Sequence, residues 1–309
     1  MIGIKEIGVH IPELRISNYE KVKEFNISGD FIEEKIGVKR VSRMESGQDT
    51  SDLCCAAYEN LIRKNSDFDT RKVDLVIVCT QNPDYTLPHT SAIVHGKLDF
   101  PKKCAAFDIS LGCSGYPYGL AIIESLMNSM NVKYGLLFTA DPYSKIIDEG
   151  DKNTSLLFGD AATVTYIGQN PVFAIGKFTF GTQGRDFEFL ISRNNKLAMN
   201  GREIFNFAAR TVPEDIKTVL RLNGLTLDDI DKFLLHQASK YIIDFLIKRI
   251  GLPEEKTPYV IANYGNTVSS SIPIMLEKYL DDKETRRVLV SGFGVGLSWS
   301  SGVLIRLEK

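Results

Sequence analysis

The sequence predicts an α/β protein made of two related halves. Short apolar runs, typical of buried strands, alternate with segments of helical length and pattern along the 309 residues. Such alternation is characteristic of sheets that are buried between layers of helices. Three of the strand runs also recur, in the same order, in the second half of the chain. These observations together predict one α/β unit that occurs twice.

The repeat follows a nearly constant offset. Three strand runs and their counterparts begin at these pairs, each with its offset: Val73 and Ile230 (157), Gly135 and Val288 (153), Ala162 and Ser301 (139). The offset shrinks only at the last pair, as a shorter loop in the second half would cause. We therefore expect a first half over residues 1–170 and a second half over residues 171–309, joined near residues 169–171.

The individual elements follow from local pattern. Period-two alternation predicts a strand at the N-terminus, and short β-branched apolar runs predict the others. The predicted strands cover residues 1–9, 73–79, 104–109, 134–140, 161–167, 232–235, 287–291 and 303–307. Longer segments with apolar residues at helical spacing predict helices over residues 114–130, 201–223, 239–250 and 269–281.

Composition excludes several classes of function. The chain has 37 basic and 39 acidic residues, a balance that gives no sign of a nucleic-acid partner. No apolar run is long enough for a transmembrane helix, so no membrane partner is expected. The N-terminal strand pattern lacks the features of a signal peptide, and a cytoplasmic location is the expectation. Five cysteines without a C-x-x-C pair, and four histidines without an H-E-x-x-H motif, predict neither a disulfide framework nor a metal site.

Cys113 is the first candidate for chemistry. It lies where a predicted strand ends, near Ile109, and a predicted helix begins, near Ser114. The positive end of a helix dipole stabilises a thiolate, so this position is expected to lower the pKa of the cysteine. Gly112 and Gly115 would let the chain turn tightly and let a substrate approach. The alternative is a small buried core cysteine, the ordinary fate of this residue type.

His236 and Asn266 are the second and third candidates. His236 ends a predicted strand, at the sheet edge where α/β proteins bind ligands. Asn266 stands before a predicted helix, 153 residues after Cys113, which matches the offset of the repeat. The two helix starts would then face each other. A structural histidine and a helix-capping asparagine are the alternatives for these two residues.

Glycines after the predicted strand at residues 287–291 suggest a further element of the site. The run Gly292–Gly296 is followed by β-like sequence, so it does not fit a dinucleotide-binding turn, which leads into a helix. Because glycines have no side chain, they instead leave backbone N–H groups exposed to face a reacting oxygen. A Cys, His and Asn set suits two reaction classes, which are a cysteine hydrolase and acyl transfer through a thioester on Cys113. The C-G-S-C-[WY] signature of one cysteine hydrolase family is absent.

Six ordered motifs give the chain a resemblance to a known family. They are Ala106–Ser110 running into Gly112–Gly115, then Phe158–Ala162, Gly201–Phe205, His236–Ala238, Gly265–Thr267, and Phe293–Gly296 before Trp299. With these motifs the chain resembles β-ketoacyl-acyl-carrier-protein synthase III, from about Ile4 to the C-terminus. The resemblance implies a thiolase-like fold, in which two duplicated α/β halves form five αβαβα layers, and a homodimer.

The resemblance also implies a mechanism. Cys113 would take an acyl group from acyl-CoA, which is a substrate, and no resident cofactor is expected. His236 and Asn266 would donate hydrogen bonds to the thioester oxygen of malonyl-acyl-carrier protein during loss of CO₂. The N–H groups of Cys113 and Val295 would form the oxyanion hole, although the family usually has glycine at the position of Val295. The alternative is a non-decarboxylating acyltransferase of a secondary-metabolite or surface-glycan pathway with the same three residues.

Substrate contacts follow from the resemblance as well. Phe31 and Lys152 stand where the family's typical enzyme holds the CoA adenine between tryptophan and arginine, so an acyl-carrier donor is an alternative to acyl-CoA. Leu87 would approach the partner's acyl pocket, where many members have phenylalanine. Three further residues are expected to bind substrate: Phe205, Ala238 and Phe293.

A basic helix face is expected to dock the carrier protein. It has three basic residues on the helix after His236: Lys240, Lys248 and Arg249. These residues would dock an acidic carrier protein, and a solvated helix face is the alternative.

One related reaction is disfavoured. The related 3-hydroxy-3-methylglutaryl-CoA synthases need a glutamate where this chain has Gln81, which argues against that reaction.

Overall fold

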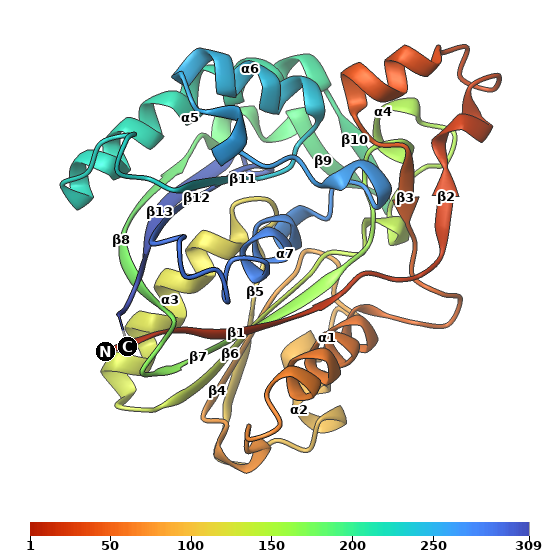
Figure 1. The fold of residues 1–309 in the computed structure, drawn as a ribbon. Coiled ribbons are helices and arrows are strands. Elements are labelled where there is room, and N and C mark those ends of the chain that lie inside the picture. Colours follow the sequence, from red (N-terminus) through yellow and green to blue (C-terminus); the bar gives the residue numbers. More distant parts are fainter. Residues whose placement is uncertain (309) are drawn as a thin grey trace.

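The computed structural model describes residues 1–308 and has the α/β architecture that the sequence predicts (Figure 1). Nine strands build the main sheet: β1 (Ile2–His10), β4 (Leu75–Cys79), β5 (Ala105–Ile109), β6 (Tyr134–Ala140), β7 (Ala162–Gln169), β8 (Phe173–Thr182), β11 (Lys232–Leu235), β12 (Arg287–Gly294) and β13 (Ser298–Arg306). Two small hairpins accompany it: β2 (Arg15–Ser17) with β3 (Arg40–Ser42), and β9 (Leu190–Arg193) with β10 (Lys196–Met199). The helices are α1 (Thr50–Lys64), α2 (Thr90–Lys97), α3 (Gly115–Met130), α4 (Lys152–Ser155), α5 (Gly201–Asn223), α6 (Lys240–Ile250) and α7 (Ser271–Glu277).

Strand pairing repeats between the two ends of the main sheet. The strand order is β11-β12-β13-β8-β1-β7-β6-β4-β5. β4 pairs in parallel with β6, which continues through antiparallel β7 to β1. β11 pairs in parallel with β12, which continues through antiparallel β13 to β8 in the same way. The two groups join where Gly3 and Ile4 of β1 meet β8. The division at residue 170 stays a prediction.

Helices and sheet are stacked in five layers (Figure 1). α1 and α2 cover the outer face of the β1, β4–β7 group, and Leu53 packs there in one buried cluster with Val78. α3 and α7 lie between the two strand groups, where Leu120 and Ile272 share a second buried cluster with strand residues. α5 and α6 cover the outer face of the other group, and Phe207 belongs to a third cluster. The predicted five-layered thiolase-like fold is therefore confirmed.

Most predicted elements are present, with some changed bounds. β6, β11 and α5 have the predicted bounds. β12 runs beyond residue 291 to Gly294 and β13 begins at Ser298, because the glycine-rich segment continues the antiparallel pairing of the two strands. α7 begins later than the predicted 269–281 because a 3-10 turn over Val268–Ser270 precedes it, and it also ends earlier, at Glu277.

The sequence prediction did not include α1, α2, β8 or the two hairpins. A local signal for α1 was present, since Asp49 and Asp52 form a capping box at its start. The sequence of β8 gives no comparable local signal. Its residues are mostly half buried, and the segments that cover them lie far away in sequence. Its position depends on pairing with β13, which lies more than a hundred residues away in sequence.

Gly8 of β1 allows α1 to lie directly on the sheet, and this contact can be tested by mutation. A Cβ atom at Gly8 would lie 2.2 Å from the Ala57 oxygen and 2.7 Å from the Leu61 nitrogen. Gly8→Ala is therefore expected to lower the free energy of unfolding by about 1–3 kcal/mol. Gly29→Ala is the control, because nothing lies within 4 Å of that position. Equal denaturation midpoints for the two variants would contradict this account of the α1 contact.

Candidate active site

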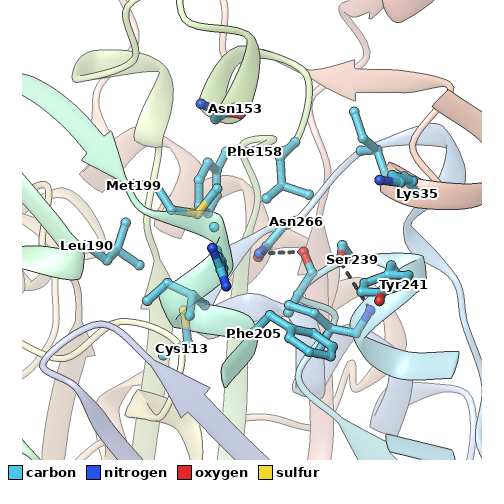
Figure 2. Close-up of a pocket in the computed structure, with 18 of the residues that line it drawn as sticks. Lys35, Cys113, Asn153, Phe158, Leu190, Met199, Phe205, Ser239, Tyr241 and Asn266 are labelled. Carbon is cyan, nitrogen blue, oxygen red and sulfur yellow. Dashed lines mark hydrogen bonds between the residues drawn. The ribbon is translucent and has the colours of Figure 1, made fainter. Parts of the chain in front are cut away.

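A cavity of about 560 Å³ opens on the surface and reaches Cys113, His236 and Asn266 (Figure 2). Each of the three residues comes from the end of a different element. Cys113 lies between β5 and α3, His236 directly follows β11, and Asn266 lies before the turn that leads into α7. The fold thus brings together three side chains that the sequence places up to 153 positions apart.

Cys113 is buried at the base of the cavity, with 4% of its surface exposed. Burial raises the pKa of Cys113 to about 12, while the N–H groups of Val295 and of Cys113 itself act to lower it. The expectation that the start of α3 lowers this pKa is therefore wrong for the unliganded protein. Loss of water around the thiolate outweighs the helix dipole, and the resting sulfur carries its proton.

Two glycines near Cys113 leave little room for a side chain. Gly294 has a φ of +156°, and a Cβ atom there would lie 2.7 Å from the Cys113 sulfur. A Cβ atom at Gly112 would lie 2.6 Å from Val295 Cγ1 and 2.5 Å from Gln81 Oε1. The glycine-rich segment at the end of β12 therefore lies against the thiol, and the N–H of Val295, which follows it, is directed at the Cys113 sulfur. Its role in an oxyanion hole stays a prediction.

His236 is a neutral imidazole, since it is 1% exposed and burial lowers its pKa to about 3. Its Nδ1 lies 2.8 Å from the hydroxyl oxygen of Ser271, whose hydroxyl is also 3.1 Å from the Val268 carbonyl oxygen. A hydroxyl serves either as donor or as acceptor, so Ser271 fits both neutral tautomers of His236. The edge of the Phe293 ring approaches the imidazole, with 5.7 Å between ring centroids.

Asn266 is held by hydrogen bonds of its backbone and of its side chain. Its N–H donates to the Leu157 carbonyl (2.8 Å), and its carbonyl accepts from Gly159 N–H (2.9 Å). The side-chain Oδ1 accepts from Val268 N–H at 2.9 Å, and Nδ2 donates to the Ala238 carbonyl at 3.4 Å. That nitrogen lies 3.5 Å from His236 Nε2. The site therefore presents a fixed amide donor next to a neutral imidazole.

Five of the six residues predicted to bind substrate line this cavity, and one does not. Phe31 and Lys152 lie at its mouth, where the Lys152 Nζ is 5.6 Å from the centre of the Phe31 ring. The other three that line it are Phe205, Ala238 and Phe293. Leu87 is 85% exposed on a loop of its own and lies outside this chain's cavity.

The residues predicted to dock a carrier protein differ in their surroundings. Lys240 donates to Asp244 (2.6 Å) and to Glu34 (3.4 Å), so neighbouring carboxylates offset much of its charge. Lys248 and Arg249 are exposed on the last turn of α6 and have no ion pair within residues 1–308.

The sequence analysis did not identify much of the apolar cavity wall. Its main members are Leu157, Phe158, Leu190, Met199, Ile204 and Tyr241. Figure 2 shows Leu190 and Met199, from the β9–β10 hairpin, on the same side of the cavity as Cys113. Hairpin strands this short leave too little alternation in the sequence to be detected.

Two further observations concern the whole of the described chain. No helix within residues 1–308 is long and apolar enough to cross a membrane. The same residues contain no group of three or more His, Cys, Asp or Glu side chains arranged to hold a metal ion.

A five-layered fold with a buried cysteine at the start of a central helix defines a condensing enzyme of the thiolase fold. The chain matches the family models "3-Oxoacyl-[acyl-carrier-protein (ACP)] synthase III" over residues 107–184 and "3-Oxoacyl-[acyl-carrier-protein (ACP)] synthase III C terminal" over residues 220–306. The chain belongs to the β-ketoacyl-[acyl-carrier-protein] synthase III family, as its relatives also show. It is an enzyme of the acyltransferase class.

Relatives and solved structures agree with this assignment over nearly the full length. The synthase III of Geobacillus kaustophilus is 33% identical, covering 97% of each chain, and that of Streptococcus uberis is 34% identical, covering 96% and 97%. Structures of the synthase from Burkholderia xenovorans (34% identity, 99% and 94% covered) and of synthase III from Thermus thermophilus (32%, 99% of each) superimpose with TM-scores of 0.93 and 0.91. Xanthomonas campestris OleA, at 16% identity over 98% and 96% of the two chains and a TM-score of 0.89, shares the fold.

The raised pKa of Cys113 predicts how its reactivity depends on pH. Only the thiolate is a nucleophile, so the rate of alkylation by iodoacetamide is expected to rise about tenfold per unit between about pH 6 and pH 9. The rate is measured by mass spectrometry of the peptide that contains Cys113, with Cys113→Ser giving the background from other cysteines. A plateau above neutral pH would mean that the resting thiol is already ionised.

Proposed function

We propose that the chain loads an acyl group onto Cys113 and then condenses it with malonyl-acyl-carrier protein, with loss of CO₂. The observation that carries this proposal is the neutral set of groups around a buried thiol. Cys113, His236 and Asn266 lie on one cavity, and burial keeps both the thiol and the imidazole uncharged. Acyl transfer and decarboxylation both need charge stabilisation in the transition state rather than in the resting site.

In the acylation step, the sulfur of Cys113 attacks the carbonyl carbon of the donor thioester. The thiol proton passes to Nε2 of His236 in the tautomer whose Nδ1–H donates to Ser271. The resulting oxyanion accepts hydrogen bonds from the N–H groups of Cys113 and Val295, which already face the sulfur. The donor's C–S bond then breaks, and the proton moves from Nε2 to the departing thiolate.

In the condensation step, the malonyl thioester loses CO₂ and the electron pair forms an enolate. Between the two steps the neutral imidazole of His236 exchanges its proton through solvent, losing it at Nδ1 and gaining one at Nε2. The enolate oxygen then accepts from the Asn266 NH₂ group and from Nε2–H of His236, with Ser271 donating to Nδ1. The enolate carbon attacks the acyl carbon on Cys113. The C–S bond to Cys113 breaks, and its thiolate takes up a proton from solvent. The synthase names of the relatives favour this course over a non-decarboxylating acyl transfer.

The donor is a thioester of a pantetheine arm, either acyl-CoA or an acyl-carrier protein, and no resident cofactor takes part. The cavity is lined by the basic residues Lys35, Lys152 and Arg202 and by many apolar side chains, which suits a phosphate followed by a pantetheine arm. We propose that Lys248 and Arg249 contact an acidic carrier, since both are exposed on α6. Lys240 contributes less, because it is paired with Asp244.

We also propose that the enzyme is a homodimer and cytoplasmic. β5 is an edge strand of the main sheet and is only half buried in one chain, so a second copy is needed to cover it. The loop that carries Leu87 is anchored by Lys145, which donates to the Pro83 carbonyl at 2.7 Å, and by Asp84, which accepts from Ser51 at 2.5 Å. A fixed loop with an exposed apolar tip suits insertion into a second copy. The location follows from the substrates, since CoA and carrier thioesters are made inside the cell.

The division of roles predicts different effects of mutation on the two steps. Removing one donor to a developing oxyanion costs about 10²–10³ in rate. Asn266→Ala is therefore expected to form the acyl adduct on Cys113 but to release CO₂ from malonyl-acyl-carrier protein about 10²–10³ times more slowly. Adduct formation is followed by intact mass and CO₂ release by radiolabel, with Cys113→Ala as the control that forms no adduct. Equal loss of both steps in Asn266→Ala would overturn the assignment.

The dimer predicts an effect of Leu87 on acyl preference. Leu87→Phe adds volume at an exposed loop tip, so it is not expected to destabilise the isolated chain. If this tip enters the acyl site of the second copy, the larger ring shifts acylation of Cys113 toward shorter chains. Light scattering measures the assembly, and intact mass measures acylation. A monomer at working concentration, or an unchanged acyl preference in a dimer, would contradict the proposal.

A further inference from the structure

One turn beside the cavity contacts both of the groups that are proposed to donate in the condensation step, the Asn266 amide and the His236 imidazole. Val268 opens the 3-10 turn that precedes α7. Its N–H donates to Asn266 Oδ1 at 2.9 Å. Its carbonyl oxygen accepts from the Ser271 hydroxyl at 3.1 Å, and that hydroxyl lies 2.8 Å from His236 Nδ1. The backbone of one residue therefore orients Asn266 directly and His236 through Ser271.

Val268 holds a backbone conformation that its own side chain disfavours. Its φ is +53°, in the left-handed region, where a β-branched residue is a rare exception. Such a conformation costs free energy and persists only where the surrounding structure imposes it. Strained residues of this kind also concentrate at active sites. A contact elsewhere in the turn is therefore needed to hold Val268 in this shape.

A buried carboxylate supplies that contact. Asp141, directly after β6, is 0% exposed and accepts from the hydroxyl of Ser269, the residue after Val268, at 2.5 Å. Its other oxygen accepts from Gln81 N–H at 2.7 Å, so the carboxylate is fixed from two sides. No cation within residues 1–308 offsets its charge. Burial of an unpaired carboxylate is costly, so its position beside the strained turn points to a role there.

Ser270 anchors the far end of the same turn. Its hydroxyl lies 2.8 Å from Thr139 Oγ1 and donates to the Thr139 carbonyl oxygen at 3.1 Å. The end of β6 thus holds both serines of the turn. Because the Ser270 contacts remain when Ser269 is changed, the turn is expected to stay attached to β6 while the shape around Val268 changes.

We propose that Asp141 is a positioning residue for the condensation step, which acts through Ser269 to hold Val268 in the conformation that orients the two donors. The inference rests on the proposed function. Without the hydrogen bond between Asp141 and Ser269, Val268 is free to relax toward negative φ. Its N–H and its carbonyl oxygen then turn away from their present partners, and both donors lose their alignment with the enolate oxygen.

The acylation step depends less on this turn. The oxyanion of that step is proposed to bind the N–H groups of Cys113 and Val295, which belong to other elements. A positioning role for Asp141 therefore predicts a selective loss, larger for CO₂ release than for acylation. A purely structural role predicts that both steps decline together.

The test measures the two steps separately in Ser269→Ala. Adduct formation on Cys113 is followed by intact mass. CO₂ release from malonyl-acyl-carrier protein is then followed by radiolabel on enzyme that has been acylated to the same extent. Both are measured at pH 8, where the carboxylate is ionised, since burial raises the pKa of Asp141 only to about 6. CO₂ release is expected to fall about 10–100-fold, and adduct formation less than about threefold.

A matched control separates this effect from the loss of any buried hydroxyl. Thr165 lies on β7, and its hydroxyl is 3.2 Å from the buried Tyr116 hydroxyl, outside the cavity lining. Thr165→Ala removes that contact and is expected to leave both rates near those of the wild type. If Ser269→Ala does not fold, Asp141→Asn takes its place. It has nearly the same size and loses the charge that strengthens the bond from Ser269, so CO₂ release should again fall selectively.

Two double variants test the strain itself. Glycine adopts a positive φ without strain, so Val268→Gly combined with Ser269→Ala should release CO₂ about tenfold faster than Ser269→Ala alone. Val268→Ala combined with Ser269→Ala removes most of the same side chain but keeps the cost of a positive φ, so it should recover less. Lower stability does not explain such a rescue, because both double variants remove more buried volume than Ser269→Ala does.

The outcomes separate this inference from the proposed function. Wild-type CO₂ release in folded Ser269→Ala, or equal losses in both of its steps, would overturn the role of Asp141 while leaving the proposed function intact. Equal or greater rescue by Val268→Ala than by Val268→Gly would overturn the part assigned to strain. A wild type that forms the adduct but releases no CO₂ would overturn the proposed function and the inference with it.

Discussion

The burial of Cys113 is the constraint on which the rest of the site depends. A sulfur at the base of an apolar cavity cannot rest as an anion, and burial accordingly raises its pKa to about 12. The same surroundings lower the pKa of His236 to about 3, so it cannot rest as a cation. Negative charge therefore develops only on the bound substrate during the reaction. Neutral hydrogen-bond donors, such as the Asn266 amide, stabilise it. A preformed ion pair would stabilise the resting state instead of the transition state.

The layered fold buries Cys113 close to the central layer of helices, so no long cavity through the protein is needed to reach it. α3 and α7 lie in the central layer, and the loops that precede them carry Cys113 and Asn266. The backbone bonds between Asn266 and residues 157–159 join the segment before α7 to the segment before β7. Asp141 adds a second tie, since it accepts from both Gln81 and Ser269, and burial raises its pKa to about 6. The site is thus assembled from loops at the ends of helices and strands, and the sheet holds these loops in place.

Much of the fold and of the active site could be predicted from the sequence, and the wrong or missing predictions have physical causes. The buried strands and the positions of Cys113 and His236 at strand ends follow from local pattern, and the repeat offset added Asn266. The pKa of Cys113 was predicted in the wrong direction, because the sequence shows the helix start but not the depth of burial. A helix dipole contributes about 0.3–1 kcal/mol, whereas full burial shifts a pKa by up to about 3–5 units. Met199 was missed because a short hairpin brings it to the site only in the folded chain.

The mouth of the cavity limits what the adenine of CoA can contribute to binding. Two groups that hold a ring between them must stand roughly 7 Å apart, since each contact needs about 3.5–4 Å. Lys152 Nζ lies 5.6 Å from the Phe31 ring centre, so the two residues contact each other in the unliganded chain. Adenine would have to replace that contact, worth about 0.5–1 kcal/mol at an exposed site, before it gained its own. Lys35 and Arg202 remain at the mouth for a phosphate, which CoA and a carrier protein both present. Under the proposed function, recognition therefore rests on the phosphate and the arm that the two donors share, and discrimination between donors falls to the surface outside the cavity.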